Sequence, residues 1–185
     1  FVGIINSIIL SIILKIFNPE YLSFLQIFLL NSSLFFLIGI LEDIFRLSIK
    51  KKLCLQFLVA SFIWYQGLKI EFINMPFIGG ISKLELPLIL SFLITVIWIV
   101  SIVNALNWMD GLDGLLCGSS IIFCGGYLFY FLSLGNFSEV LILLFFILSS
   151  LGFLIYNFYP AKIFMGDSGS YLIGSIIAFF SIHSE

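Results

Sequence analysis

Charged residues are scarce in this chain. Asp, Glu, Lys and Arg together make up 10% of its 185 residues, and the formal net charge is −2. Hydrophobic residues make up 62%, whereas an average soluble domain carries about 45–50%. These proportions exclude an ordinary water-soluble domain and predict a polytopic membrane protein. The small net charge gives no indication of a nucleic-acid partner, and we expect none.

Cysteine and histidine are also rare. The three cysteines, Cys54, Cys117 and Cys124, lie in apolar segments, and their odd number predicts buried thiols rather than a disulfide framework. No Cys or His cluster indicates a zinc site, because His183 is the one histidine. We expect His183 to be an interfacial residue without a specific role.

Long apolar runs alternate with short polar segments. A spanning helix needs about 20 predominantly apolar residues. The runs predict an all-α, polytopic transmembrane helix bundle of about seven spans, which forms a single integral-membrane domain over residues 1–185. The chain opens directly on an apolar run and stops just past a helix, so we expect it to be truncated at both ends. The expected spans are 1–17, 21–41, 53–68, 87–103, 115–133, 140–156 and 171–182.

The loops of such a bundle fall on two faces. Loops 42–52, 104–114 and 157–170 share the first face, and the positive-inside rule makes this face cytoplasmic because it has the excess of basic residues. We therefore expect a multi-pass protein of the bacterial inner membrane, with lysines 50–52 anchoring the topology at anionic lipid. A direct contact between these lysines and a phosphate substrate is the alternative. The loop 69–86 predicts a short extracytoplasmic hairpin that turns at Gly79-Gly80.

Acidic residues gather on the predicted cytoplasmic face in three places. The segment N-A-L-N-W-M-D-G-L-D-G-L-L contains Asp110 and Asp113, the segment F-M-G-D-S-G-S contains Asp167, and Glu42 precedes Asp43. Acids beside bilayer segments are costly and are usually functional. The bland alternative is a helix end with a glycine stop, at which the acids face water.

Neighbouring carboxylates repel one another unless a cation holds them. Aspartate oxygens suit Mg²⁺, which binds one or two carboxylates together with substrate phosphates; Mn²⁺ is the alternative ion. Glycines adjoin the acids, and both segments lead into helices whose N-termini favour anions. Together these features predict a phosphate-plus-metal site, although each glycine taken singly is also compatible with helix packing.

At these residues the chain resembles the polyprenyl-phosphate N-acetylhexosamine-1-phosphate transferase family (glycosyltransferase family 4). This family includes the undecaprenyl-phosphate GlcNAc-1-phosphate transferases and the phospho-N-acetylmuramoyl-pentapeptide transferases. The segment G-I-L-E-D resembles the family's G-x-x-D-D motif, with Glu42 in place of the first acid. The signature N-F-x-P-A-K-x-F-M-G-D-x-G-S is met from Asn157 to Ser170. The signature N-x-x-N-x-x-D-G-x-D-G-L is met by Asn104, Asn107, Asp110, Gly111, Asp113, Gly114 and Leu115.

The resemblance implies transfer of a HexNAc-1-phosphate from a UDP-sugar donor to a polyprenyl phosphate acceptor, with release of UMP, for cell-envelope polysaccharide. GlcNAc is the expected sugar, membrane lipid is the expected surrounding, and the oligomeric state is left open. The family's N-terminal Pro-Gly-Gly loop and C-terminal His-x-His-His loop are absent from these residues. The chain therefore resembles an internal fragment or a shortened member of the family.

The resemblance also implies roles for individual residues. Asp167 and Asp113 would bind Mg²⁺, and Asp43 with Glu42 would position or deprotonate the polyprenyl phosphate. Asp110 and Asp113, steadied by Asn104 and Asn107, would form the nucleotide and metal side of the cleft. Asn157 would orient Asp167, and Lys162 would meet phosphate. The catalytic residues that the resemblance implies are Glu42, Asp43, Asp110 and Asp113, and the substrate-binding residues are Asn104, Asn107, Asn157 and Lys162.

Three other classes of protein are considered. A secondary transporter would carry acids near the bilayer midplane and would show related halves, neither of which the sequence indicates. A structural membrane subunit would leave the gathering of acids and glycines unexplained. A CDP-alcohol phosphatidyltransferase would need an arginine and further spaced acids, which residues 115–125 lack.

Overall fold

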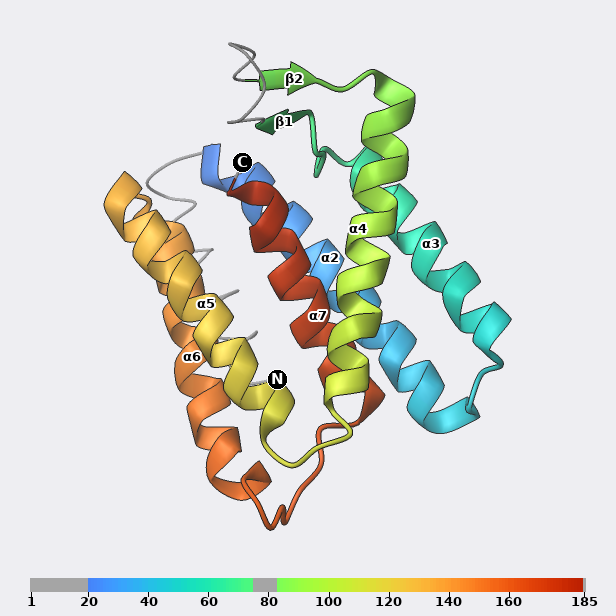
Figure 1. Ribbon diagram of the computed structural model, residues 1–185, viewed down its shortest axis with the longest axis vertical. Helices are drawn as coiled ribbons and strands as arrows, with labels where there is room; N and C mark the ends of the chain where they lie inside the picture. The colour runs from blue at the N-terminus through green and yellow to red at the C-terminus, as the bar shows by residue number, and fades with distance from the viewer. Residues whose placement is uncertain (1–19, 75–82, 185) are drawn as a thin grey trace.

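The computed structural model describes residues 20–74 and 83–184, and within these ranges it contains six helices and one small sheet. The helices lie roughly side by side in a bundle (Figure 1), so the prediction of an all-α architecture is confirmed. The helices are α2 (Glu20–Phe45), α3 (Ile49–Tyr65), α4 (Leu88–Met109), α5 (Leu115–Leu134), α6 (Phe137–Asn157) and α7 (Gly166–His183), and the strands are β1 (Phe72–Asn74) and β2 (Lys83–Glu85).

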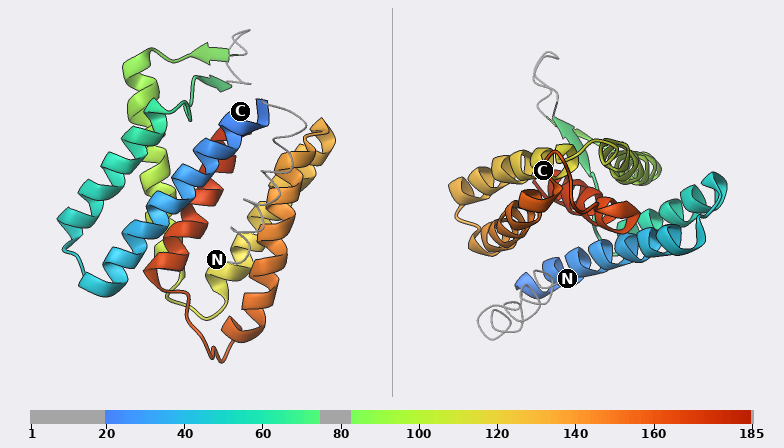
Figure 2. Two further views of the ribbon diagram at one scale, coloured as in Figure 1. Left: turned by 180° about the vertical axis from the view of Figure 1, so that it is seen from behind. Right: turned by 90° about the horizontal axis from the view of Figure 1, so that it is seen from below.

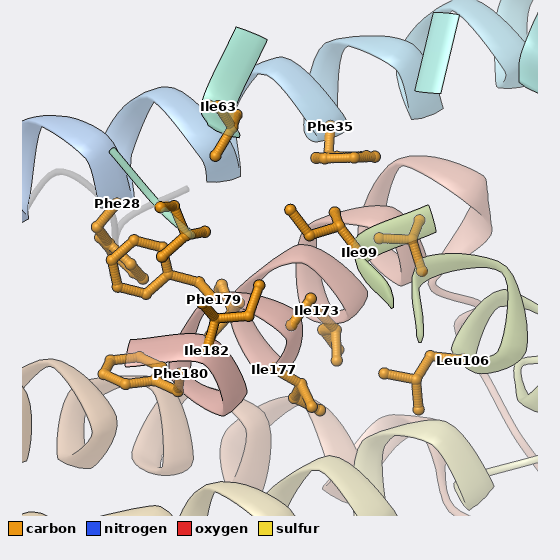
Figure 3. Packing of buried hydrophobic residues seen from close by; sticks show 14 of the residues in the cluster. Phe28, Phe35, Ile63, Ile99, Leu106, Ile173, Ile177, Phe179, Phe180 and Ile182 are labelled. Carbon is orange, nitrogen blue, oxygen red and sulfur yellow. The ribbon is translucent and has the colours of Figure 1, made fainter. Parts of the chain in front are cut away.

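Helix α7 forms the centre of the bundle. It packs against α2, α4 and α5, while α5 pairs with α6 and α3 packs on α2 and α4 (Figure 2). Tyr171, Phe179 and Phe180 of α7 are almost completely buried. Figure 3 shows the aromatic part of this core, where Phe28 of α2 lies next to Phe179 and Phe180. Lipid is as apolar as these side chains, so the hydrophobic effect does not drive such helices together. Close packing of their side chains holds them in contact instead.

Four of the described helices, rather than seven, are long and apolar enough to cross a membrane: α2 from Ser23, α4, α5 and α6. The expected span 1–17 lies outside the described residues. Helix α3 has 17 residues and opens with three lysines, and α7 begins with a polar turn and is buried among its neighbours. The sequence-based count was too high because it treated every apolar run as a span, including the runs of these two helices.

Most helices extend beyond the apolar runs that predicted them. Helix α2 continues to Phe45 and therefore contains Glu42 and Asp43, which the sequence placed in a loop. Helix α4 continues through both signature asparagines to Met109. Helix α7 begins at Gly166, so Asp167 lies in its first turn. Backbone hydrogen bonds set these boundaries, and the hydropathy of the sequence does not reveal them.

The predicted hairpin is present. Strand β1 pairs antiparallel with β2, and Phe72 lies opposite Glu85. The predicted turn at Gly79-Gly80 lies outside the described residues. The hairpin extends from one end of the bundle, above α3 and α4 (Figure 1).

His183 was expected to be an interfacial residue without a specific role, but its side chain makes specific contacts in the structure. Its Nε2 atom lies 3.3 Å from Oε1 of Glu139, a buried residue in the first turn of α6, and Ser138 donates a hydrogen bond to Oε2 of the same carboxylate. The imidazole ring also packs against Phe24 and Phe131. His183 therefore ties the end of α7 to the start of α6, because a buried carboxylate needs a polar partner.

Candidate active site at one end of the bundle

Three connections of the chain lie at the same end of the bundle, opposite the hairpin (Figures 1 and 2). They are residues 46–48 between α2 and α3, residues 110–114 between α4 and α5, and residues 158–165 between α6 and α7. The polar segments that the sequence assigns to one membrane face therefore lie together in space, although more than a hundred residues separate the first from the last.

Asp43, at the end of α2, binds the first turn of α7. Its Oδ1 and Oδ2 atoms accept hydrogen bonds from the backbone N–H groups of Asp167 and Ser168, both at 3.0 Å. The first N–H groups of a helix have no partner inside the helix and favour an anion. The sequence predicted a phosphate at this helix start, whereas the structure shows that a carboxylate of the protein takes these two donors.

Two glycines permit this close approach. A side chain on Gly39 of α2 would overlap the backbone of Asp167 and Ser168, so the two helices meet with nothing between them. Gly166 has φ +72°, a conformation that L side chains rarely adopt, and a Cβ there would lie 3.3 Å from both carboxylate oxygens of Asp43. Gly39 was not among the predicted site residues, although it begins the G-I-L-E-D segment.

Asn107 orients the carboxylate of Asp167. Its Nδ2 atom donates to Oδ1 of Asp167 at 2.6 Å and lies 2.8 Å from Oγ of Ser170, to which it also donates. The sequence assigned the orientation of Asp167 to Asn157, and gave Asn107, together with Asn104, the role of steadying Asp110 and Asp113. The structure corrects both assignments, because α4 runs on through Asn107 and turns this amide towards α7.

Asp110 lies beside Asp167 and Asp43, and we call these three carboxylates the acidic cluster. Partial burial, followed by the negative charges of Asp167 and Asp43, raises the pKa of Asp110 from 3.8 to about 6, although a hydrogen bond from the backbone of Gly166 acts in the opposite direction. The cluster is therefore a place where a further negative charge is costly and a cation is favoured.

Asp113 and Asn157 join two loops instead of facing this cluster. Oδ2 of Asp113 accepts a hydrogen bond from the backbone of Ala161 at 3.0 Å. Asn157 accepts one from Gly114 at 3.1 Å and donates one to the carbonyl of Ile163 at 2.9 Å. Both residues thus hold the 158–165 loop against the start of α5. The side chain of Lys162, the remaining residue predicted in this loop, is exposed.

Only one of the two carboxylate oxygens of Glu42 has a neighbouring polar group. Its Oε1 atom lies 4.0 Å from Nζ of Lys52, and the same ammonium lies 5.4 Å from the centre of the Tyr171 ring. Its buried Oε2 atom has no hydrogen-bond partner among the described residues. Buried polar atoms without partners are rare in proteins, so this corner of the site has polar capacity left for a ligand or water.

The sequence predicted that Asn104 steadies Asp110 and Asp113. In the structure its side chain does not reach either of them. Its amide pairs with that of Gln56 on α3, a fully buried residue that sequence reasoning missed. Gln56 carries one weak signal in the sequence: it is the single amide within the apolar run 53–63. A polar side chain at such a position is usually hydrogen-bonded to another helix.

The oxygen atoms at this end of the bundle suit a hard divalent cation. Within residues 20–74 and 83–184, no group of three His, Cys, Asp or Glu side chains is spaced to hold an ion on its own. Mg²⁺ does not require such a group, since it commonly binds one or two carboxylates and completes its shell with water and substrate phosphate. Asp167, which is oriented by Asn107 and borders the raised-pKa carboxyl of Asp110, fits this arrangement.

The fold and this site define a multi-pass membrane protein with a carboxylate-rich site at one end of its helix bundle. The profile of glycosyl transferase family 4 matches residues 25–185, so the chain belongs to this family.

Two curated relatives illustrate the match. Over 145 residues the chain is 39% identical to a "probable undecaprenyl-phosphate N-acetylglucosaminyl 1-phosphate transferase" of Bacillus subtilis, which covers 78% of this chain and 40% of that protein. Over 200 residues it is 34% identical to a phospho-N-acetylmuramoyl-pentapeptide-transferase of Streptococcus gordonii, which covers 100% of this chain and 59% of that protein. The chain thus spans between two fifths and three fifths of the length of these relatives.

Proposed function

We propose that the protein containing this chain transfers an N-acetylhexosamine 1-phosphate from a UDP-sugar to undecaprenyl phosphate and releases UMP. Membership of glycosyl transferase family 4 and the names of the two relatives support this reaction class. The observation that carries the proposal is the acidic cluster, in which the last turn of α2, the residue after α4 and the first turn of α7 bring Asp43, Asp110 and Asp167 to one place.

In the proposed reaction, a phosphate oxygen of the acceptor attacks the β-phosphorus of the UDP-sugar. A new P–O bond forms there, the bond from the β-phosphorus to the bridging oxygen breaks, and UMP leaves with that oxygen. Negative charge collects on the phosphate oxygens as this occurs, so the protein must supply positive charge and fixed orientation. The acidic cluster supplies positive charge only when it binds a cation.

Asp167 is the residue that we propose as the first Mg²⁺ ligand, with Asp113 as the second; Mn²⁺ accepts the same donors. When bound, such an ion neutralises charge on the diphosphate. Asn107 keeps one oxygen of Asp167 fixed, so that its other oxygen is presented in one orientation. The place of Asp113 as a ligand rests on the sequence motif, since its Oδ2 atom is engaged by Ala161.

Asp43 and Glu42 are proposed to meet the acceptor phosphate. Each oxygen of Asp43 accepts one backbone hydrogen bond and keeps capacity for another, since an ionised carboxylate accepts about four. The second ionisation of a phosphate monoester lies near pH 6, so the reaction asks little of a base. Because a carboxylate oxygen accepts but does not donate, we propose that this pair meets the monoprotonated acceptor, whose P–O–H donates to a carboxylate oxygen such as the unpartnered Oε2 atom of Glu42.

The name of the Bacillus subtilis relative supports GlcNAc as the sugar. The bacterial relatives and the four candidate spans support a multi-pass protein of the bacterial cytoplasmic membrane. The basic residues near the acidic cluster support a site that faces the cytoplasm.

The proposal is tested by UMP release from the full-length protein in detergent. The protein is offered undecaprenyl phosphate and, in turn, UDP-GlcNAc, UDP-GalNAc, UDP-MurNAc-pentapeptide and UDP-glucose, with Mg²⁺ or with EDTA. We expect UMP only with Mg²⁺ and fastest with UDP-GlcNAc. Release with another UDP-HexNAc would correct the sugar, and release in EDTA would remove the metal. No release with any donor would contradict the proposed function.

A further inference from the structure

Gln56, which is fully buried, and Asn104, which is half-buried, form an amide pair between α3 and α4. Nδ2 of Asn104 donates to Oε1 of Gln56 at 2.6 Å, and Nε2 of Gln56 donates to Oδ1 of Asn104 at 3.4 Å. Nδ2 of Asn104 also donates to the carbonyl of Val100 at 2.8 Å. Gln56 has no exposed surface. Both polar atoms of the Asn104 side chain are therefore engaged inside the protein.

Gln56 and Asn104 each lie one helical turn away from a residue of the site. Gln56 follows Lys52 by four residues on α3, and Asn104 precedes Asn107 by three residues on α4, so each amide shares a helix face with a site residue. Lys52 faces Glu42, and Asn107 holds Asp167. The Gln56–Asn104 contact is thus a direct connection between the helix that carries Lys52 and the helix that orients Asp167.

The other contacts of α3 are mostly apolar, with one further hydrogen bond to α4, from Nε1 of Trp64 to Oγ of Ser91 at 3.4 Å. The helix lies at the edge of the bundle and packs on α2 and α4 (Figures 1 and 2). Apart from Gln56, its buried side chains are Ala60 and Ile63. Small apolar contacts of this kind tolerate sliding or rotation, whereas two opposed amides accept only one register. Losing Asn104 would remove these hydrogen bonds from the fully buried amide of Gln56, which is costly.

We propose that Gln56 is a positioning residue of the transferase site, and that Asn104 acts through Gln56 rather than by binding the nucleotide. The pair sets the register of α3 against α4 and so places Lys52 on α3 near Glu42, while α4 holds Asn107 against Asp167. This inference rests on the proposed function, and it moves Asn104 from the substrate-binding group to the scaffold of the site.

The test uses four variants of the full-length protein: Gln56→Leu, Asn104→Leu, the double variant, and the exchange variant Gln56→Asn/Asn104→Gln. The rate of UMP release gives kcat and the KM for UDP-GlcNAc, and thermal unfolding in detergent reports the fold. Because the site is displaced rather than emptied, we expect each single variant to lower kcat about 10- to 100-fold while the KM for UDP-GlcNAc changes less than about twofold. The double variant is expected to be no slower than the slower single variant.

The exchange variant separates positioning from simple loss of polarity. It keeps one short and one long amide facing each other, so we expect it to recover at least part of the lost kcat. Gln26→Leu, at an exposed position of α2, is the matched control and is expected to leave kcat unchanged. An active wild type with a Gln56→Leu variant of normal kcat would overturn the inference. A raised KM in Asn104→Leu alone would assign Asn104 to the nucleotide. A wild type that releases no UMP would instead contradict the proposed function.

Discussion

Asp110 carries the clearest electrostatic signature of the site. Its pKa is raised to about 6 by burial, by Asp167 and by Asp43, in that order. A raised pKa means that the folded protein holds the proton of Asp110 more tightly than the unfolded chain does. The charge of Asp110 therefore lowers the free energy of unfolding once the pH rises above 3.8, the pKa of Asp110 in the unfolded chain. This loss of stability is complete above about pH 6.

A pH series on the metal-free protein tests this charge. In EDTA, the contribution of Asp110 to stability falls between about pH 4 and pH 6, and Asp110→Asn removes that fall. After discounting for the screening of a partly exposed group, we expect Asp110→Asn to raise the unfolding midpoint by about 1–3 °C at pH 7. At pH 4 the variant and the wild type should unfold together. A variant that is less stable at pH 7 would contradict the assignment.

Asn107 is expected to act on catalysis through Asp167. Asn107→Ala removes the 2.6 Å hydrogen bond and lets the carboxylate turn. Losing such a partner of a metal ligand costs about 10- to 100-fold in activity or metal affinity, so the Mg²⁺ concentration for half-maximal UMP release should rise. Asn136→Ala is the matched control, because Asn136 lies before α6 and makes no side-chain cap hydrogen bond. Equal Mg²⁺ requirements in the two variants would exclude this role for Asn107.

At the scale of residues, the sequence identifies the acids of the site but not their partners. Spacing shows that Asp43, Asp110 and Asp167 occur in unusual polar segments, since such residues are costly beside a bilayer. Spacing along the chain does not show that Asn107 faces Asp167, or that Asp113 faces Ala161, because these contacts cross 60 and 48 residues. Gln56 was missed for the same reason, as a single amide makes no pattern by itself.

At the scale of elements, the contact between α2 and α7 positions the site. The two helices pack closely along their length, and Gly39 lets the end of α2 touch the start of α7. This contact brings Asp43 to the N–H groups of α7. Asp43 therefore caps α7 as well as belonging to the site. A change in the packing of α2 against α7 would also move its carboxylate.

Gly39→Ala is expected to disturb this contact. The added methyl group would overlap the backbone of Ser168, which cannot give way as a side chain can, so α2 and α7 must separate. Overpacking of this kind costs about 1–3 kcal/mol of unfolding free energy, and a displaced Asp43 should also slow UMP release. Gly152→Ala on α6, where a Cβ meets nothing within 4 Å, is the matched control and should behave as wild type. Equal stability of the two variants would refute the close contact.

The sequence predicted helix identity better than helix ends. The run 115–133 became α5, Leu115–Leu134, almost unchanged, because Gly114 and Gly135 bound it on both sides. In α2, α4 and α7 the helices continue into polar residues, since hydrogen bonding rather than hydropathy ends a helix. These extensions carry the site, because they place Asp43, Asn107 and Asp167 on regular helical faces.

At the scale of the whole molecule, the alternation of spans brings the three polar connections to one end of the bundle and the hairpin to the other. This separation could be predicted from the sequence, because each helix reverses the direction of the chain. The central place of α7 could not be predicted, since its polar first turn lowers its apparent hydropathy while its burial arises only from neighbours far away in the chain.

The central claim is that carboxylates from separate helices form one cation-dependent diphosphate site, and the rate of UMP release by Asp167→Asn in the full-length protein tests it most directly. Removing one oriented charge at such a site costs about 10²- to 10³-fold in rate, so we expect a loss of at least about 100-fold, with normal insertion and unfolding. Glu71→Gln, at an exposed position beside the hairpin, should retain the wild-type rate. An Asp167→Asn variant as fast as the wild type would contradict the account.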